Sequence, residues 1–481
     1  MKLGFKEKLS YGLGAVGKDL VYMLSASYVL YYFQDVLGVS AIAMGVILLA
    51  ARVFDAFNDP IMGIIVAKTK TRWGKFRPWL MIGTLTNAAI LFLMFACPPT
   101  LSPSGLVAYA AITYILWGVT YTMMDIPYWS MIPAFTKSGK EREGLTTLAR
   151  SCAGVGSALI TIFTVIVVKM IGRAIVGSEA SAKEVEIAGF KWFALIIATL
   201  FIVFILITCI NIKEKATVDM ESPSVKQMFK ALISNDQAMT IVVTIVLINI
   251  AIYTTSNLVI YFFKYDFGGE GWQGSFTLFN TFGGGIQILA MMIMYPVLRK
   301  FCSNIKVFYI CLTSAIIGYG VLFGLTFLDM SNVMVLFVPA FFIFSANGVL
   351  NVLTTVFLAN TVDYGDMKNY RRDESVIFSM QTFVVKLGSG VSALIASISL
   401  SINHLKADSS DASQAFDFSK AVSDSSKLGL RMTMTIIPII GLIIAVIVFK
   451  KKFILTEKKM DEINLELRNR KNEATNMNGG N

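Results

Sequence analysis

The chain has 481 residues, of which 55% are hydrophobic and only 15% are charged. Soluble domains carry about 25% charged residues, so a soluble protein of this composition would lack the polar side chains to cover its surface. A lipid bilayer removes that difficulty, because a spanning helix needs about 20 mainly apolar residues. The net charge of +11 would indicate nucleic acid binding in a soluble protein. Here Lys and Arg concentrate in short loops, so we expect membrane lipid and no nucleic acid as a partner.

The cysteines and the histidine give no signal for a disulfide framework, a thiolate or imidazole metal site, or a cofactor. The five cysteines are odd in number, show no Cys-x-x-Cys spacing and lie mostly in apolar runs, so we interpret them as small hydrophobic residues. The single histidine, His404, falls in a polar loop. We therefore expect no cofactor and no histidine chemistry inside the membrane.

Apolar runs of spanning length recur along the chain and predict an all-α membrane protein with about twelve transmembrane helices. The first run lacks a small-residue cleavage pattern, so we expect it to remain as the first helix. The expected helices lie near residues 11–34, 41–66, 78–97, 105–133, 145–171, 190–211, 237–264, 273–298, 305–328, 332–362, 376–402 and 429–449.

A polar stretch divides these runs into two groups of about six, as in the major facilitator fold with its two parallel repeats. We predict an N-terminal bundle at 1–212, a cytoplasmic linker at 213–236, a C-terminal bundle at 237–451 and a frayed cytoplasmic tail at 452–481. Basic residues are abundant in the loops after the second, fourth, eighth and tenth expected helices. By the positive-inside rule, both termini and the linker then lie in the cytoplasm.

Charged residues at membrane depth concentrate in the first half of the chain. Each costs at least about 2.5–3.5 kcal/mol to insert, so it needs a function or a partner. The second half has chiefly Lys386, whereas the first half has Lys18, Asp19, Asp35, Arg52, Asp55, Asp59, Asp125 and Arg150. This asymmetry places the chemistry mainly in the first half.

The second expected helix carries a group of oxygen ligands. Asp55 and Asp59 are four residues apart and Asn58 is three residues from Asp55, so the three side chains share one helix face. Two neighbouring carboxylates repel each other unless a cation lies between them or one takes up a proton. We therefore predict a site for a small monovalent cation, with protons as competitors. The alternative is that the aspartates only pair with Arg52 or Lys18.

The fourth expected helix combines a carboxylate with aromatic rings. Tyr121, Asp125 and Trp129 are spaced by four and share a face. A carboxylate accepts hydrogen bonds from sugar hydroxyls, and an indole ring covers the apolar face of a pyranose. Thr122, on an adjacent face, can add an oxygen to the cation site. The alternative is that Trp129 is only an interfacial anchor and that Asp125 pairs with Arg150.

Further charges on two other helices complete the predicted site. Lys18 and Asp19 are adjacent, so their side chains point about 100° apart on a helix. Asp19 can then face a sugar while Lys18 neutralises a neighbouring carboxylate. Arg150 on the fifth expected helix can donate two parallel hydrogen bonds to a carboxylate or to hydroxyls.

Short motifs occur in order along most of the chain. They are Lys8-Leu9-Ser10-Tyr11-Gly12, Gly17-Lys18-Asp19, Arg52-x-x-Asp55-Ala56-x-Asn58-Asp59-Pro60-Ile61-Met62-Gly63, Arg72-Trp73-Gly74-Lys75-Phe76-Arg77-Pro78-Trp79, Tyr114-Ile115-Leu116-Trp117-Gly118, Asp125-Ile126-Pro127-Tyr128-Trp129-Ser130, Glu141-Arg142-Glu143, Val362-Asp363-Tyr364-Gly365 and Gln381-Thr382-Phe383-Val384-Val385-Lys386. Together they resemble the glycoside–pentoside–hexuronide:cation symporters of the major facilitator superfamily, and among them the melibiose permease-like members.

The resemblance implies functional roles for particular residues. It implies a Na⁺ site, with Li⁺ or H⁺ as alternative coupling ions, at Asp55, Asn58, Asp59 and Thr122. It implies sugar contacts from Lys18, Asp19, Tyr121, Asp125, Trp129, Arg150, Gln381 and Lys386. We further assign structural or gating roles to Arg52, Arg142 and Glu143, the last two as salt-bridge partners that hold an outward-open state.

The expected function is import of a galactoside such as melibiose with a cation, by alternating access, across a bacterial plasma membrane. The expected partners are the glycoside, the cation, lipid and cytoplasmic regulators of sugar uptake. One departure from the family pattern is Asn351, where melibiose permeases carry a tryptophan. It leaves open the sugar contact from the second half and the exact sugar.

Other functions remain as alternatives. A lactose- or raffinose-type sugar, a pentoside or a hexuronide is one, although Asp19 with Asp125 favours a neutral glycoside. An intramembrane enzyme is another, because Asp55-x-x-x-Asp59 superficially resembles the motif of prenyl transferases. Those enzymes need two such motifs to hold Mg²⁺-diphosphate, and the second half has no matching pair. We therefore predict a transporter and not an enzyme.

Overall fold

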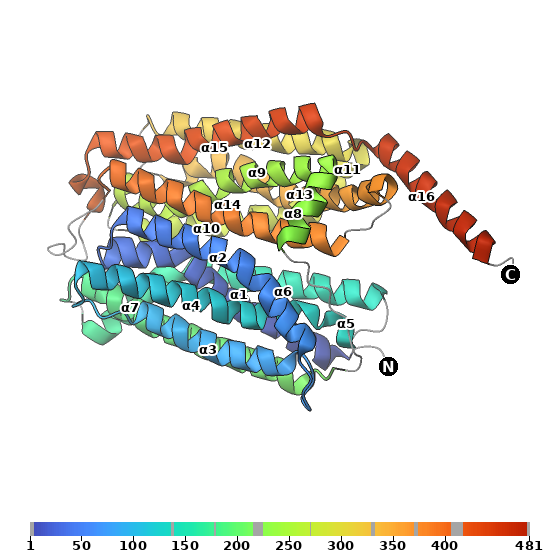
Figure 1. Cartoon of the computed structure of the whole chain (residues 1–481). Helices are drawn as coiled ribbons and strands as arrows, with labels where there is room; N and C mark the ends of the chain where they lie inside the picture. The colour runs from blue at the N-terminus through green and yellow to red at the C-terminus, as the bar shows by residue number, and fades with distance from the viewer. Residues whose placement is uncertain are drawn as a thin grey trace. The chain divides into compact units, whose positions relative to one another are not determined.

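The computed structural model describes residues 4–135, 139–177, 179–214, 225–269, 271–328, 332–369, 374–405 and 417–478. Every regular element within these ranges is a helix, which confirms the predicted all-α class (Figure 1). The helices of the first part are α1 (Phe5–Tyr31), η1 (Tyr32–Val36), α2 (Ala41–Lys68), α3 (Arg77–Phe95), α4 (Pro103–Ser130), α5 (Ile132–Phe135), α6 (Gly139–Val176) and α7 (Ala182–Asn211).

The remaining helices include four short π-helical or 3₁₀ segments next to longer ones. They are α8 (Val225–Ser234), α9 (Asp236–Tyr261), η2 (Phe262–Phe267), α10 (Trp272–Leu289), η3 (Ala290–Met294), α11 (Tyr295–Phe301), α12 (Asn304–Leu325), η4 (Val333–Leu336), α13 (Phe337–Asn369), α14 (Glu374–Ile402), η5 (Phe418–Ala421), α15 (Asp424–Lys452) and α16 (Glu457–Asn478).

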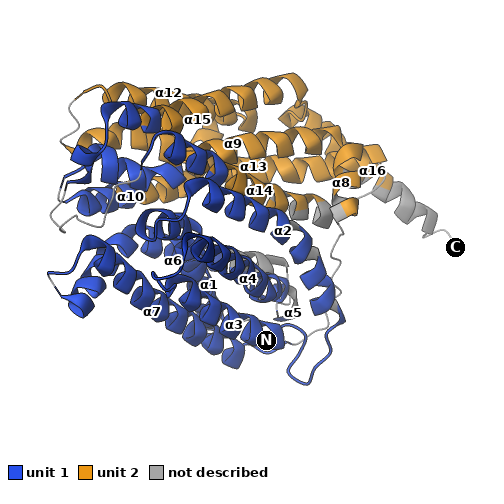
Figure 2. Ribbon diagram, turned by 60° about the vertical axis from the view of Figure 1, so that its left-hand side comes forward, with its two compact units in different colours: residues 1–221, 256–281, 393–430 blue, residues 222–255, 282–392, 431–481 orange. Residues whose placement is uncertain are grey.

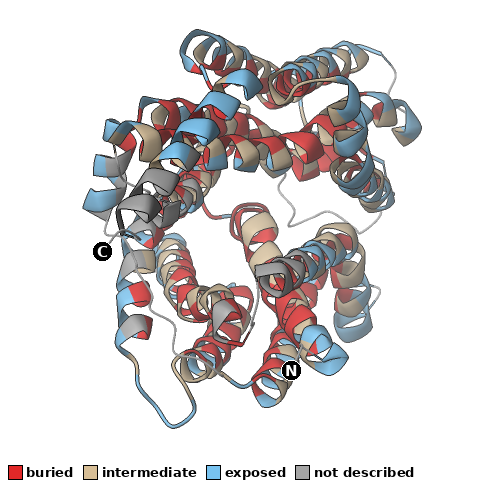
Figure 3. Ribbon diagram, turned by 90° about the vertical axis from the view of Figure 1, so that its right-hand side faces the viewer, coloured by how far each residue is buried: buried red, intermediate tan, exposed pale blue. Residues whose placement is uncertain are grey.

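The long helices have the length and composition of membrane spans. Among the described residues, 11 helices are long and apolar enough to cross a membrane. The helix α1, with 27 residues, is about 40 Å long, but Lys18 and Asp19 make it less apolar than the others. Large apolar side chains are exposed on many helices, for example Met170, Ile210 and Met292. Figure 3 shows such exposed stretches along helices whose other sides are buried, as expected for surfaces that face lipid.

The chain forms two compact units (Figure 2). Unit 1 contains residues 1–221, 256–281 and 393–430, and unit 2 contains residues 222–255, 282–392 and 431–481. Unit 1 therefore combines the expected first half with two segments of the second half, whereas unit 2 contains only residues that follow the first half. The predicted division into bundles at 1–212 and 237–451 concerns repeats along the chain, and it stays a prediction.

In unit 1, aromatic packing fixes the register of α1 against α4. The rings of Tyr11 and Tyr128 are stacked, with centroids 4.4 Å apart and planes 7° apart. Each hydroxyl donates a hydrogen bond of 2.5 Å to the backbone carbonyl of the other tyrosine. Both residues are completely buried. This reciprocal contact lies about two helical turns from Lys18 on α1 and less than one turn from Asp125 on α4, so it positions both side chains.

The loop between α2 and α3 is held by Glu214, just after α7. Its carboxylate accepts hydrogen bonds from the backbone amides of Lys75, Phe76 and Arg77, at 2.7, 2.9 and 3.1 Å. These amides lie at the N-terminus of α3, which begins at Arg77 after the N-cap Phe76, and free N–H groups and the helix dipole there favour a negative charge. Arg77 donates a further hydrogen bond of 2.6 Å to the carbonyl of Cys209. The basic loop is thereby tied to the end of α7.

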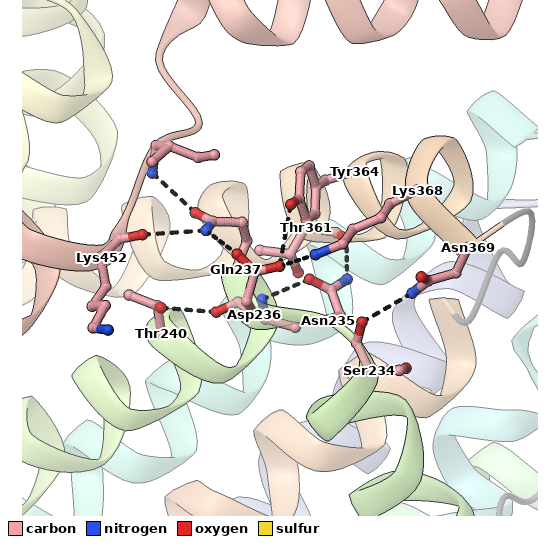
Figure 4. Close-up of polar contacts among 12 residues, drawn as sticks. Ser234, Asn235, Asp236, Gln237, Thr240, Thr361, Tyr364, Lys368, Asn369 and Lys452 are labelled. Atoms are coloured by element: carbon pink, nitrogen blue, oxygen red, sulfur yellow. Dashed lines mark hydrogen bonds and ion pairs between the residues drawn. The ribbon is translucent and has the colours of Figure 1, made fainter.

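The start of α9 in unit 2 is surrounded by polar contacts (Figure 4). Asn235 accepts a hydrogen bond of 3.0 Å from the amide of Ala238, as an N-cap residue does. The carboxylate of Asp236 accepts hydrogen bonds from Tyr364 at 3.1 Å and from Lys368 at 2.5 Å. Both partners lie near the end of α13, so the motif that contains Tyr364 joins these two helices.

The sequence predicted a frayed tail at 452–481, and this prediction is wrong for most of the segment. Residues Glu457–Asn478 form the helix α16, in which Met460 and Ile463 are buried in the apolar core of unit 2. These two side chains are three residues apart and share a face. Glu457 forms an ion pair of 2.7 Å with Arg299. The sequence was misleading because the apolar face of α16 is narrow and the rest of the helix is charged.

A buried ionic cluster in unit 1 was not expected from the sequence. Lys264, in η2, forms an ion pair with Asp35, in η1, and the two side chains are only 4% and 1% exposed. Tyr265 also donates a hydrogen bond to Asp35. Lys264 donates to the hydroxyl of Tyr31 at 3.2 Å, and that hydroxyl donates to Glu186 at 2.9 Å. The cluster satisfies charges that would be costly to bury alone.

We predict that Lys264→Met strongly destabilises the protein, because it leaves the Asp35 carboxylate buried without its cation. Removing one partner of a buried pair costs about 3–5 kcal/mol. The melting temperature of the purified protein in detergent should therefore fall clearly, and the double variant Asp35→Asn/Lys264→Met should recover part of the loss. Lys420→Met is the matched control, because Lys420 pairs with Asp417 while its side chain is 81% exposed. Equal melting of Lys264→Met and wild type would contradict the prediction.

Candidate functional site

Lys18 is the centre of a charged cluster in unit 1. Its ammonium group lies 2.9 Å from a carboxylate oxygen of Asp19 and 2.9 Å from one of Asp125. It also donates a hydrogen bond of 3.2 Å to the hydroxyl of Tyr121. The Lys18 side chain is 6% exposed, whereas the Asp125 side chain is 30% exposed. One buried cation therefore holds two carboxylates from α1 and α4 close together, with Asp125 the more accessible of them.

Trp129 and Arg150 belong to the same cluster. The indole N–H of Trp129 donates a hydrogen bond of 3.2 Å to Asp125. The Arg150 guanidinium, from α6, lies 4.2 Å from the Trp129 ring centroid, and the Lys18 ammonium lies 5.1 Å from it. Cations at such distances over a ring are attracted by its π-electrons. The structure thus pairs Asp125 with Lys18 and places Arg150 over the indole ring, where the sequence had suggested an Asp125–Arg150 pair as one alternative.

Ser157 is a further member that sequence reasoning missed. Its hydroxyl donates a hydrogen bond of 3.2 Å to Asp19. Asp19 is thereby held by Lys18 on one oxygen and by Ser157 on the other. The spacing could have indicated that Ser157 belongs to the cluster, because Ser157 follows Arg150 by seven residues and so lies on the same face of α6.

The cluster has the chemistry needed to bind a hydroxylated, uncharged molecule. Its two acidic and two basic side chains nearly balance in charge, so a neutral ligand leaves no excess charge buried. The carboxylates accept hydrogen bonds and the guanidinium donates them. Trp129 adds an apolar ring to which the C–H face of a sugar can pack.

The predicted cation ligands lie on α2 and α4 in unit 1 but have different partners. Asp55 forms an ion pair of 3.3 Å with Arg52, and its side chain is 7% exposed. Asp59 accepts a hydrogen bond of 3.0 Å from Thr122. The side-chain nitrogen of Asn58 is buried and has no hydrogen-bond partner among the described residues. The alternative in which an aspartate pairs with Arg52 thus holds for Asp55, whereas Asp59 and Thr122 bring two oxygens together.

The approach of α4 to α2 at Asp55 requires a glycine. A Cβ atom at Gly118 would lie 2.7 Å from the Asp55 carboxylate, closer than real Cβ contacts occur.

The described residues contain no group of three or more His, Cys, Asp or Glu side chains that could hold a metal ion. A site made of two carboxylates and neutral oxygens matches a monovalent ion better than a divalent one, which prefers more anionic oxygens.

Not every predicted site residue can be placed in this cluster. Lys386 lies on α14 in unit 2, so its position relative to the residues of unit 1 is not defined. The side chain of Gln381, also on α14, lies outside the described residues, as do those of Arg142 and Glu143 on α6. The residues that unit 1 brings together are Lys18, Asp19, Tyr121, Asp125, Trp129 and Arg150 in one group and Arg52, Asp55, Asp59 and Thr122 in another.

Comparison with known proteins identifies the family. Residues 10–453 match the family described as MFS/sugar transport protein, where MFS denotes the major facilitator superfamily. Because the match covers most of the chain, this protein belongs to that family. It is therefore a multi-pass membrane protein of a transporter family.

Individual relatives are similar over nearly the whole chain. The isoprimeverose transporter of Lactiplantibacillus pentosus is 28% identical over 441 residues, which cover 91% of this chain and 86% of that protein. A lactose permease of Lactobacillus delbrueckii subsp. bulgaricus is 27% identical over 476 residues, which cover 96% of this chain and 72% of that protein.

A solved structure with the same fold is that of a bacterial homologue of the human lysosomal transporter Spinster. It has a TM-score of 0.63 at 11% sequence identity, and the match covers 92% of this chain and 95% of that one. At such low identity the likeness shows the fold alone. Together with the family match, it confirms the major facilitator fold predicted from the sequence.

We predict that Gly118→Ala weakens any cation activation of sugar uptake that depends on Asp55, because the new methyl group displaces the Asp55 carboxylate. Gly154→Ala on α6 is the matched control, since a Cβ atom there meets nothing within 4 Å. The measurement is sugar uptake as a function of Na⁺, Li⁺ and H⁺ concentration. The concentration of the activating cation that gives half-maximal uptake should rise about tenfold or more in Gly118→Ala, corresponding to at least about 1.4 kcal/mol. An unchanged half-maximal cation concentration would show that Asp55 is not part of the cation site.

Proposed function

We propose that this protein is a symporter that imports a neutral galactoside, such as melibiose, together with a monovalent cation. The supporting observation is the arrangement of Asp19 and Asp125 around Lys18, beside Trp129. This group offers hydroxyl acceptors next to an aromatic ring in an electrically balanced setting. The lactose permease among the relatives supports the choice of sugar class, because lactose is also a galactoside.

The sugar would bind to the more exposed members of the cluster. Asp125, at 30% exposure, accepts hydrogen bonds from sugar hydroxyls, while Arg150 donates to them. Trp129 packs against the apolar face of the ring and stays oriented by its hydrogen bond to Asp125. Lys18 forms ion pairs with both carboxylates and holds them in place. The protein thus provides a preorganised set of partners, which lowers the cost of ordering side chains on binding.

The cation would bind beside the sugar on α4. Asp59 and Thr122 supply two oxygens at one place, and Asp55 and Asn58 lie on the same face of α2. Thr122 is three residues from Asp125, so a cation that fixes this part of α4 also fixes the sugar ligands. Each ligand should then raise the affinity for the other by the same factor. We propose Na⁺ as the coupling ion, with Li⁺ and H⁺ as alternatives.

The membrane context completes the proposal. The distribution of Lys and Arg favours cytoplasmic termini in a bacterial plasma membrane, with the linker at 213–236 also cytoplasmic. The two predicted bundles would then alternate between outward-open and inward-open states, with Arg142 and Glu143 stabilising the outward-open one. Cytoplasmic regulators of sugar uptake would be the further partners.

We predict that uptake of radiolabelled melibiose and lactose is stimulated by Na⁺, and that Asp59→Cys abolishes this stimulation. The physical reason is that a neutral thiol cannot replace the carboxylate as a ligand of a hard cation. The measurement is uptake into cells or membrane vesicles with and without Na⁺. Lys427→Met, which removes one side of a pair with the exposed Asp424, is the control and should behave as wild type.

The possible results separate the parts of the proposal. Uptake that is equally strong in Asp59→Cys and still stimulated by Na⁺ would contradict the location of the cation site. If neither sugar moved under any cation gradient, the galactoside proposal would fail. The family and the fold would stand, and hexuronides and pentosides would be tested next.

A further inference from the structure

The short helix α8 (Val225–Ser234) precedes the spanning helix α9 and exposes a face that is both apolar and basic. Phe229 is 44% exposed and Ile233 is 73% exposed. Lys226 and Lys230 are exposed as well. Neighbouring members of this group are three or four residues apart, so all four side chains share one face of the helix. Apolar side chains of this size are unfavourable in water, so this face needs an apolar environment.

Contacts on the other sides of α8 hold it against unit 2. Leu232 is only 6% exposed and packs in the apolar core of the unit. The ring of Phe229, at the border of the exposed face, lies edge to face against that of Phe383 on α14, with centroids 5.9 Å apart. The helix therefore keeps one side towards the protein, and its basic and apolar face points away from it.

The end of α8 lies level with the ends of three spanning helices. The carbonyl of Ser234 accepts a hydrogen bond of 3.1 Å from Asn369, the last residue of α13. Gln237, in the first turn of α9, donates one of 3.2 Å to the carbonyl of Lys452, the last residue of α15 (Figure 4). The helices α9, α13 and α15 are all long and apolar enough to cross a membrane. Their common end marks one surface of the membrane, and α8 lies at that surface.

The helix α8 does not continue α9 in a straight line. Asn235 separates the two helices and accepts a hydrogen bond of 3.0 Å from the amide of Ala238, as an N-cap residue does. Figure 1 shows α8 turned away from the direction of α9. With 10 residues, α8 is about 15 Å long, about half the thickness of the apolar layer of a bilayer. It is therefore a helix at the membrane surface and not a spanning one.

A second group of basic residues lies beside the start of α9. The last turn of α15 contains three exposed lysines, residues 450–452, and the contact of Gln237 with residue 452 brings this turn next to α9. The ion pairs that unit 2 forms at this end involve other basic residues. Lys226, Lys230 and the three lysines of α15 thus have no acidic partner among the described residues.

This combination of side chains matches the chemistry of an anionic phospholipid. When a helix lies on a membrane, its apolar side chains enter the boundary between headgroups and acyl chains, and its lysines reach the headgroups. Clustered lysines at the surface are attracted by anionic lipid. A soluble anion would account for the lysines but not for the exposed Phe229 and Ile233. The apolar side chains therefore favour lipid as the source of the anionic group.

We propose that the exposed face of α8, formed by Lys226, Phe229, Lys230 and Ile233, binds anionic phospholipid such as phosphatidylglycerol together with the lysines at 450–452. The bound lipid holds α8 at the membrane surface, next to the contacts that join the start of α9 to α13 and α15. The inference goes beyond the proposed function and does not depend on which sugar or cation is carried.

The test measures hydrogen exchange of the α8 amides in the purified full-length protein in lipid nanodiscs. One set of nanodiscs contains phosphatidylcholine alone, and the other contains phosphatidylcholine and phosphatidylglycerol in equal amounts. The variant Lys226→Gln/Lys230→Gln removes two positive charges, whereas Lys226→Arg/Lys230→Arg keeps them. The matched control is Lys458→Gln/Lys459→Gln, which removes the same charge from α16.

The expected result is that phosphatidylglycerol slows the exchange of α8 in the wild type about tenfold or more. Each lysine near an anionic surface adds about fivefold to the affinity, and a lipid that binds only the folded helix lowers the population of its open form. The arginine pair and the control should behave as wild type. In the glutamine pair, exchange should differ by no more than about twofold between the two membranes.

The variant Ile233→Ser tests the apolar part of the surface. This side chain is 73% exposed, so it contributes little to packing within the protein. Its replacement by a polar side chain should speed the exchange of α8 about threefold or more in both membranes, because the helix loses part of its apolar contact with lipid. Exchange at the wild-type rate would overturn lipid as the ligand of this face.

Other results would also contradict the proposal. One is exchange of wild-type α8 at the same rate in both membranes, and another is a full effect of phosphatidylglycerol in the glutamine pair. Slowing by soluble polyglutamate, without an effect of phosphatidylglycerol, would assign the surface to an acidic protein instead. The proposed function is tested separately by sugar uptake, so it stands or fails independently of these results.

Discussion

The ion pairs of Lys18 with Asp19 and Asp125 are the interaction on which the candidate site depends. Inside a membrane protein a single carboxylate is costly to bury, and two carboxylates side by side repel each other. One buried ammonium group, 2.9 Å from each, attracts both carboxylates and offsets their repulsion. The stacked pair Tyr11–Tyr128 supports this arrangement, because it fixes α1 against α4 about two turns from Lys18 and less than one turn from Asp125.

The helix α4 connects the two groups of unit 1. Thr122 faces Asp59 on α2, while Tyr121, Asp125 and Trp129 face Lys18 on α1. A change in the position of this helix therefore affects both groups together. This shared element gives a physical basis for coupling between two ligands, since coupling needs a structural element that both of them bias.

Much of the fold was predictable because long apolar runs have few alternatives in a membrane. The predicted spans agree with helices of the structure, and i,i+4 spacing correctly grouped Tyr121, Asp125 and Trp129. Contacts between distant segments were not predictable, because a sequence does not show which residues from other helices lie opposite. The partner of Asp35 is Lys264, and Ser157 reaches Asp19. For the same reason the packing of α16 was not predicted, since its apolar face is only a few residues wide.

The central claim is that a cation and a sugar bind to one connected site through α4. Its most direct test is the affinity for melibiose or lactose measured by calorimetry with and without Na⁺, together with the Na⁺ affinity measured with and without the sugar. The account predicts that each ligand tightens the other by the same factor, as linkage requires, and that Thr122→Val reduces this factor. Sugar affinity that is unchanged by adding Na⁺ or Li⁺ and by changing the pH would contradict it.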